Sequence, residues 1–187
     1  DFTVFYAWQS DTPARDNRSF VEAAARNALK EVERKGSLES APRLDKDTLG
    51  VPGMPEIANT ILEKIRNSSA FLADITYIGQ GSPTKDAGVK KISNPNVLLE
   101  LGFVLGILGW ERIICVMNTH YGDKDELPFD LRHRRWPITY ELAPDASAQE
   151  RGEKKQTVCG QLIEAIGAIA KLPAVQGQAR TADRVAA

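Results

Sequence analysis

Short apolar runs alternate along this chain with longer segments of helical periodicity. Strands are predicted at 2–7, 43–44, 70–73, 112–117 and 136–142, and helices at 17–35, 55–67, 94–109 and 147–172. This alternation predicts a parallel sheet with helices on both faces, because each crossover returns the chain to the same end of the sheet. Continuously apolar strand interiors fit such a sheet. We therefore expect an α/β, doubly wound fold, with 136–142 as an edge strand because it contains Pro137.

The composition is that of an ordinary globular protein. The chain has 187 residues, of which 42% are hydrophobic and 26% charged, enough for one core or at most two small ones. We expect residues 1–172 to form one domain. Residues 173–187 are rich in Gln, Ala, Arg and Gly, which predicts a linker or a frayed tail.

Charge, hydropathy and cysteine usage argue against several classes of partner. The net charge of −1 offers no whole-chain reason to expect nucleic acid. No apolar run is long enough to cross a bilayer, so no membrane partner is expected. Cys115 and Cys159 lack metal or redox spacing, and His120 and His133 are isolated, so no metal site is expected. These features predict a cytoplasmic protein with reduced thiols.

Three loops that follow predicted strands are the expected ligand-binding loops. They are 8–11, 45–53 and 74–93, and the helix that begins at Asn94 starts at the same end of the sheet. Ligands of doubly wound sheets bind at the carboxyl ends of the strands. The stretch 77–93 is predicted to be one long functional or mobile loop. The candidate binding residues are Trp8, Gln9, Ser10, Asp11, Asp45, Asp47, Thr48, Asp74 and Asn96.

Glu100 is a lone carboxylate in a helical segment that is otherwise almost wholly apolar. Asn94 is the predicted N-cap of this helix, Pro95 opens its first turn and Gly109 ends it. A helix that is apolar on almost all sides is expected to be buried, and a buried carboxylate is costly unless it has partners. Two readings stay open: a pocket carboxylate, or one that reaches solvent or offsets the helix N-terminus.

The polar loops also have two readings each. Trp8 to Asp11 predict either stacking on a flat ring with polar contacts to a sugar, or a turn that caps the next helix. Asp45, Asp47 and Asp74 share this ambiguity. Neither a dinucleotide-binding glycine fingerprint nor a P-loop is present. The basic cluster 132–135 either contacts phosphates, pairs with 123–126 or another subunit, or is a solvated loop.

Four segments together resemble bacterial TIR-like domains. They are 5–11, 45–53, 94–102 and 127–132, and the resemblance spans about residues 2–142. It is strongest to the anti-phage effectors gated by cyclic nucleotides. The resemblance implies a flavodoxin-like sheet of five strands, and NAD⁺ glycohydrolase activity with Glu100 as the catalytic residue. NAD⁺ would then be a consumed substrate rather than a cofactor. The loop 45–55 corresponds to the family's self-assembly loop, and a sensor domain for a cyclic nucleotide would lie outside this chain.

The reaction implied by this resemblance breaks the bond between nicotinamide and its ribose. Positive charge develops on the ribose, and a Glu100 carboxylate would stabilise it. Trp8 would stack on a ring, while Ser10, Asp11 and Asp74 would hold sugar or amide groups. Two alternatives stay open. One is a nucleoside 2-deoxyribosyltransferase-like enzyme with a helix glutamate as nucleophile, and the other is a TIR scaffold without catalysis.

Overall fold

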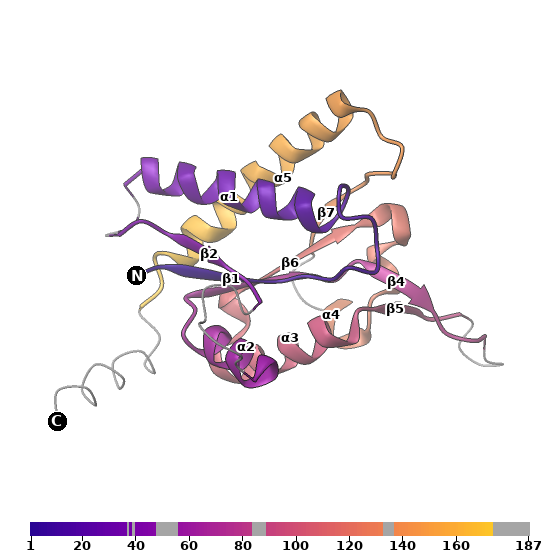
Figure 1. Cartoon of the computed structure of the whole chain (residues 1–187), viewed down its shortest axis with the longest axis horizontal. Helices are drawn as coiled ribbons and strands as arrows, with labels where there is room; N and C mark the ends of the chain where they lie inside the picture. Colours follow the sequence, from indigo (N-terminus) through magenta and orange to yellow (C-terminus); the bar gives the residue numbers. More distant parts are fainter. Residues whose placement is uncertain (37, 39, 48–55, 84–88, 133–136, 174–187) are drawn as a thin grey trace.

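Five parallel strands form the central sheet. The computed structural model describes residues 1–36, 38, 40–47, 56–83, 89–132 and 137–173, and the statements below concern these residues (Figure 1). The strands are β1 (Thr3–Ala7), β2 (Arg43–Asp45), β3 (Ala70–Asp74), β6 (Ile113–Asn118) and β7 (Ile138–Tyr140), in the spatial order β2-β1-β3-β6-β7. All four pairings are parallel. The expected α/β, flavodoxin-like, doubly wound sheet is therefore confirmed, with β7 at one edge.

Helices cover both faces of this sheet. α1 (Arg18–Arg34) and α5 (Ala148–Ile169) lie on one face, and α2 (Ile57–Arg66), α3 (Pro95–Leu108) and the short α4 (Phe129–Arg132) lie on the other (Figure 1). Side chains of β1 alternate between the two cores. Val4 and Tyr6 pack under α1 and α5, whereas Phe5 and Ala7 pack under α2 and α3. This alternation follows from the two-residue period of a strand. No described helix is both long and apolar enough to cross a membrane.

The ends of α3 follow from its sequence. The Asn94 side chain accepts hydrogen bonds from the backbone N–H groups of Asn96 and Val97, and Pro95 is the first helical residue. Gly109 ends the helix with φ = 76°, a conformation that favours glycine. The predicted start and end of this helix are confirmed. A 3₁₀ turn (Trp110–Arg112) then leads into β6.

The segment 77–93 was predicted to be a single long loop, and that prediction is wrong. It contains an antiparallel hairpin of β4 (Tyr77–Gln80) and β5 (Lys91–Ser93) that projects beside the main sheet (Figure 1). Both ends are tied to the body. The Tyr77 hydroxyl donates to the Asp123 carbonyl at 3.1 Å, and the Ser93 hydroxyl donates to the Ile75 carbonyl at 2.7 Å. The glycines and charged residues between these two ends are typical of a loop, so the sequence pattern does not indicate the hydrogen bonds that hold the hairpin to the body of the protein.

The expectation that α3 is buried on almost all sides is also wrong. Leu99 in α3 is 72% exposed. The buried face of α3 is a single stripe of Val97, Leu101, Val104 and Leu108. A helix that packs on one side of a sheet buries one face only unless another layer covers it. The predicted start of α2 at Pro55 falls outside the described residues.

The remaining predicted elements are confirmed within one to three residues. Ser147 caps α5 by accepting a hydrogen bond from the Glu150 N–H at 3.1 Å. Two further 3₁₀ turns (Thr119–Tyr121 and Lys124–Glu126) connect β6 to α4. The tail was predicted at 173–187, and all of it except Pro173 lies outside the described residues, as does most of the basic cluster. Arg132 is described, and its guanidinium donates to the Asp125 carbonyl at 3.4 Å.

Candidate functional site

A cavity of about 210 Å³ lies at the carboxyl end of β1. It is built from four parts of the chain: the end of β1 with the following loop, the loop after β2, α2, and the start of α3. This is the place where ligands bind in doubly wound sheets. The described residues that line it are Phe5, Tyr6, Ala7, Trp8, Gln9, Ser10, Asp47, Ile61, Asn94, Asn96 and Glu100.

Glu100 lines this cavity from the second turn of α3, where its side chain is only partly exposed. Burial raises the pKa of the carboxyl group from 4.5 to about 7. Among the described residues, no hydrogen bond or ion pair to its side chain is present that would favour the charged form. A group that titrates near neutral pH inside a cavity is typical of functional sites. Of the two readings of Glu100, the geometry therefore favours the pocket carboxylate.

The loop after β1 is held by Gln9, which is almost fully buried. The Gln9 side-chain oxygen accepts hydrogen bonds from the N–H groups of Asp11 (2.6 Å) and Thr12 (3.0 Å). Its amide nitrogen donates to the Thr12 hydroxyl at 2.5 Å and to Asp74 Oδ2 at 3.4 Å. Both polar atoms of the Gln9 side chain are thus hydrogen-bonded within the protein, to the loop and to Asp74. Gln9 was predicted to bind ligand, and it lines the cavity between Trp8 and Ser10.

Asp11 was predicted to bind ligand, but its carboxylate lies against another part of the protein. Asn94 Nδ2 donates to Asp11 Oδ2 at 2.6 Å, while Asn94 Oδ1 caps α3. This contact joins the β1–α1 loop to the helix that carries Glu100. Asn94 itself lines the cavity together with Asn96. From the sequence, Asn94 was identified only as a helix cap. Its position two residues before Asn96 was the available signal that it shares the site.

Asp74 is completely buried and does not line the cavity. Burial raises the pKa of its carboxyl group, and hydrogen bonds from Thr76 and Gln9 oppose that shift. The Thr76 N–H donates to Asp74 Oδ1 at 3.1 Å. The structure therefore places Asp74 behind Gln9, where it supports the loop. Direct contact between Asp74 and a ligand, as expected from the sequence, does not fit this position.

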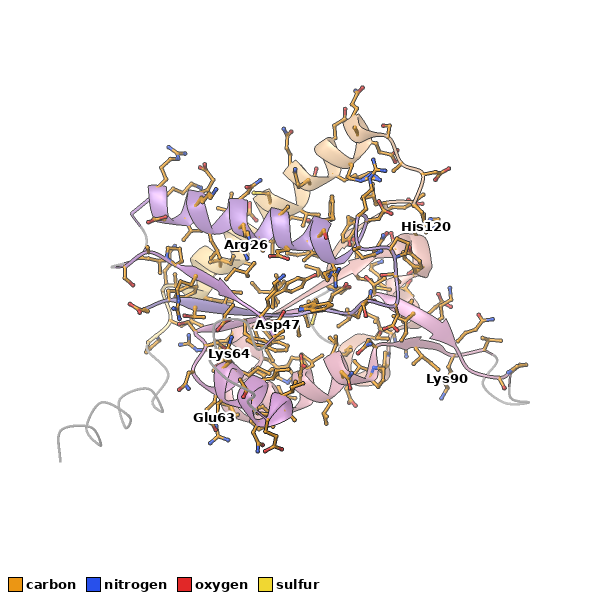
Figure 2. All side chains as sticks on the ribbon, viewed as in Figure 1. Arg26, Asp47, Glu63, Lys64, Lys90 and His120 are labelled. Atoms are coloured by element: carbon orange, nitrogen blue, oxygen red, sulfur yellow. The ribbon has the colours of Figure 1, made fainter. Side chains whose placement is uncertain are left out.

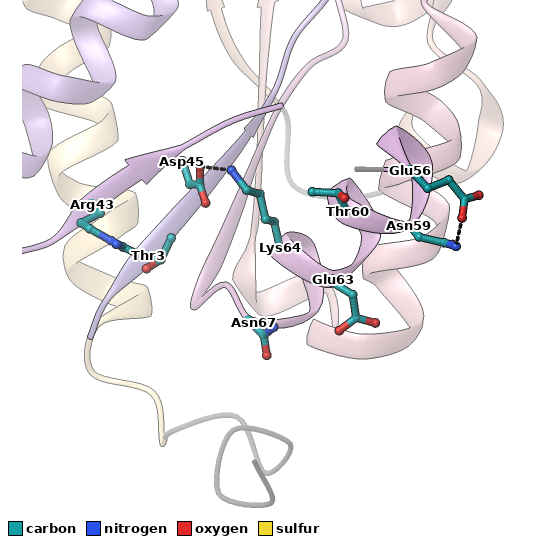
Figure 3. A pocket seen from close by; sticks show the side chains of 9 residues that line it. All are labelled: Thr3, Arg43, Asp45, Glu56, Asn59, Thr60, Glu63, Lys64 and Asn67. Carbon is teal, nitrogen blue, oxygen red and sulfur yellow. Dashed lines mark hydrogen bonds and ion pairs between the residues drawn. The ribbon is translucent and has the colours of Figure 1, made fainter. Parts of the chain in front are cut away.

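The loop after β2 contributes one described carboxylate to the cavity. Asp47 lines it, adopts φ = 42°, and lies at the level of the sheet between the helix layers in the view of Figure 2. Thr48 falls outside the described residues. Asp45 lies elsewhere, in a groove of about 550 Å³ between β2 and α2, where it accepts a hydrogen bond from Lys64 Nζ at 2.8 Å (Figure 3). Asp45 is therefore not brought to Glu100.

A third hollow, of about 800 Å³, lies at the other side of the sheet between the starts of β6 and β7 and the second half of α5. Cys115 lines it, and burial raises the pKa of the thiol to about 12, so this thiol is not a nucleophile at neutral pH. Cys159 is also free. Neither this hollow nor the groove beside β2 lies at the carboxyl end of β1.

The electrostatic character of the Glu100 cavity is acidic. Its described lining includes the carboxyl groups of Glu100 and Asp47 but neither lysine nor arginine. The described residues contain no cluster of His, Cys, Asp and Glu that could hold a metal ion. Anionic groups are poorly accommodated in such a cavity, whereas a cationic ring or a sugar with developing positive charge is well accommodated.

Comparison with known proteins adds little to this geometry. Neither a family model nor a curated protein matches the sequence. A solved structure, that of a 2-desoxiribosyltransferase from Leishmania mexicana, is similar at 16% identity with a TM-score of 0.37. The match covers 63% of this chain and 65% of that one, so this chain spans just under two thirds of that protein. A likeness this distant carries no argument about activity.

Proposed function

We propose that this chain is an NAD⁺ glycohydrolase domain that cleaves the bond between nicotinamide and its ribose, with Glu100 as the catalytic residue. The observation that supports this most strongly is the position of Glu100. Its carboxyl group lines a cavity at the carboxyl end of β1, has a pKa raised to about 7, and has no cationic partner among the described residues. A carboxylate without its own cation is suited to meet positive charge on a substrate.

The chemistry needs Glu100 as an anion. The pyridinium ring leaves as neutral nicotinamide, and positive charge moves onto the ribose as an oxocarbenium ion, as in glycoside hydrolysis. The Glu100 carboxylate stabilises that charge, and water then adds to the ribose to give ADP-ribose. A bound pyridinium also favours the ionised form of Glu100, because an opposite charge close by lowers the pKa of a carboxyl group.

The size of the cavity limits which part of NAD⁺ enters it. About 210 Å³ is smaller than the roughly 300–1,000 Å³ of typical ligand pockets. We assign the cavity to the nicotinamide ring and its ribose, with the adenosine half outside it. The side-chain amides of Asn94 and Asn96 and the hydroxyl of Ser10 are the available partners for sugar hydroxyls and the carboxamide.

The test is to incubate concentrated protein with NAD⁺ and measure free nicotinamide by chromatography. The wild type is expected to release nicotinamide, and Glu100→Gln to lose at least about 100-fold in rate because it removes the stabilising charge. Glu33→Gln is the matched control, since Glu33 is an exposed carboxylate on α1 away from the cavity. Turnover retained in a folded Glu100→Gln variant would exclude the proposed role.

The same assay separates the alternatives. A deoxyribosyltransferase-like enzyme would leave NAD⁺ intact but exchange the base of a deoxynucleoside, and a scaffold would do neither. Assembly through residues 45–55, a cyclic-nucleotide sensor outside this chain, a role in anti-phage defence and a cytoplasmic location remain proposals based on the TIR resemblance. Most of the 45–55 loop lies outside the described residues.

A further inference from the structure

Arg18 lies beside the Glu100 cavity without an evident structural role. Its guanidinium carbon is 4.5 Å from the centroid of the Trp8 ring, and Trp8 lines the cavity. This distance is within the range of a cation–π contact. Arg18 is the first residue of α1, directly after the loop that Gln9 holds in place. The guanidinium therefore lies against the Trp8 ring, which forms part of the cavity wall.

The local structure does not explain a positive charge at this position. A cation in the first turn of a helix is unfavourable, because the helix N-terminus is itself positive, and α1 has no acidic residue in that turn. Within the described part of the chain, Arg18 makes no ion pair. Two other cations near the loop after β2 are paired: Lys46 Nζ lies 2.7 Å from Glu22 and Lys64 Nζ lies 2.8 Å from Asp45.

We infer that Arg18 binds the diphosphate of the dinucleotide substrate. This inference rests on the proposed function and extends it to the part of NAD⁺ that the cavity does not hold. In NAD⁺ the diphosphate is joined to the nicotinamide ribose through a single CH₂ group, so it must lie just outside a cavity that takes that ribose. Arg18 meets the requirement for a planar donor fork that matches phosphate oxygens.

The two charges then orient the substrate. The Glu100 carboxylate attracts the pyridinium ring into the cavity, whereas Arg18 attracts the phosphates from beside Trp8. A dinucleotide bound in reverse would keep its diphosphate beside Arg18 but would place the neutral adenine in the cavity, and so lose the contact between the pyridinium and the Glu100 carboxylate. The arrangement therefore favours one direction of binding.

The inference is tested by titrating ADP-ribose, the product that carries the diphosphate but no pyridinium, into the protein in a calorimeter. Wild-type protein is expected to bind it with an affinity that falls as salt increases. Arg18→Gln is expected to weaken binding about tenfold or more, and Arg18→Lys to weaken it less, because lysine keeps the positive charge but loses the planar donor fork. Arg15→Gln is the matched control, because Arg15 is an exposed arginine on the same loop.

Three results would overturn the inference: no binding of ADP-ribose to the wild type, unchanged binding to Arg18→Gln, or equal losses in the Gln and Lys variants. Equal losses would mean that Arg18 acts by packing on Trp8. Circular dichroism of each variant establishes that it is folded. Nicotinamide release from NAD⁺ is measured in parallel. Release by the wild type with normal ADP-ribose binding in Arg18→Gln would remove this inference and leave the proposed function intact.

Discussion

At the scale of single residues, Glu100 combines a cost to folding with a chemical use. Its carboxyl group is buried enough to raise its pKa to about 7, yet the described residues provide no compensating cation. A group of this kind is destabilising in its charged form, so the free protein at neutral pH holds a mixture of protonated and ionised Glu100. Substrate with a positive charge shifts this mixture toward the anion. Two predictions follow from the titration of this one group.

The pH dependence of kcat/KM should report the pKa of Glu100 in the free enzyme. Because the anion is the active form, kcat/KM for NAD⁺ is expected to rise with pH, with a midpoint near 7, and then to level off. Tyr6, which also lines the cavity, stays protonated because burial raises the pKa of its phenol. A profile that is flat between about pH 6 and 8 would contradict this assignment.

Replacement of Glu100 should also change stability in a pH-dependent way. The pKa of Glu100 is raised in the folded state. The contribution of Glu100 to the free energy of unfolding is therefore most favourable below about pH 4.5, and that contribution is lost as the pH rises through about 7. Glu100→Gln is therefore expected to raise the free energy of unfolding at pH 8 by about 1–2 kcal/mol, a figure reduced because the side chain is partly solvated. The difference in the free energy of unfolding between the wild type and Glu100→Gln is measured by urea unfolding at pH 8 and below about pH 4.5.

The matched comparison is the Glu33→Gln variant, which should change little at either pH because Glu33 is exposed on α1. Equal stability of wild type and Glu100→Gln at pH 8 would show that the Glu100 carboxylate is well solvated. It would also remove the reason for a midpoint near 7 in the activity profile.

At the scale of elements, α3 shows how far a local pattern extends. The cap at Asn94, the first-turn proline and the terminal glycine of α3 could all be predicted from the sequence, because each satisfies a backbone requirement of the helix end itself. Which face of α3 is buried could not be predicted from the sequence. Nearly every position is apolar, so the sequence contains no polar stripe to mark the outer face. One face of α3 packs on the sheet, and no element among the described residues covers the opposite face.

Two leucines on α3 provide a direct check of this packing. Leu101→Ala is expected to cost about 2–5 kcal/mol, because Leu101 is 5% exposed and truncation leaves a cavity. Leu99→Ala, the same change two residues earlier, should stay within about 0.5 kcal/mol because Leu99 is 72% exposed. Chemical denaturation of both variants measures the difference. Similar losses at the two positions would mean that the face of α3 that carries Leu99 is covered in solution.

The β4–β5 hairpin is the element that sequence reasoning missed. Its strands are only four and three residues long, and its hydrogen bonds to the body come from Tyr77 and Ser93. Residues this far apart in sequence are brought together by the tertiary structure. The region after β3 thus contains two paired strands before the Asn94 cap.

At the scale of the whole molecule, the strand order positions the site. β1 lies between β2 and β3. The chain therefore passes from β1 to its neighbour β2 on one side, and then crosses over to β3 on the opposite side of β1. α1 covers one face and α2 and α3 cover the other (Figure 1). The cavity lies at the carboxyl end of β1, where ligands bind in sheets of this kind. Trp8 lines the cavity together with Asn94 and Glu100, although Trp8 is far from these two residues in the sequence.

Apart from the β4–β5 hairpin and the short α4, the sequence by itself determined the order of strands and helices, the caps of α3, and the loops after β1 and β2 as candidate parts of the site. These features depend on hydrophobic period and backbone chemistry, which are local. Only the tertiary structure decided that Asp74 supports Gln9, that Asp11 binds Asn94, that Asp45 lies apart, and that Arg18 stacks on Trp8. Aspartates at strand ends look alike in a sequence, and only the packing of neighbouring elements determines which side chain each one meets.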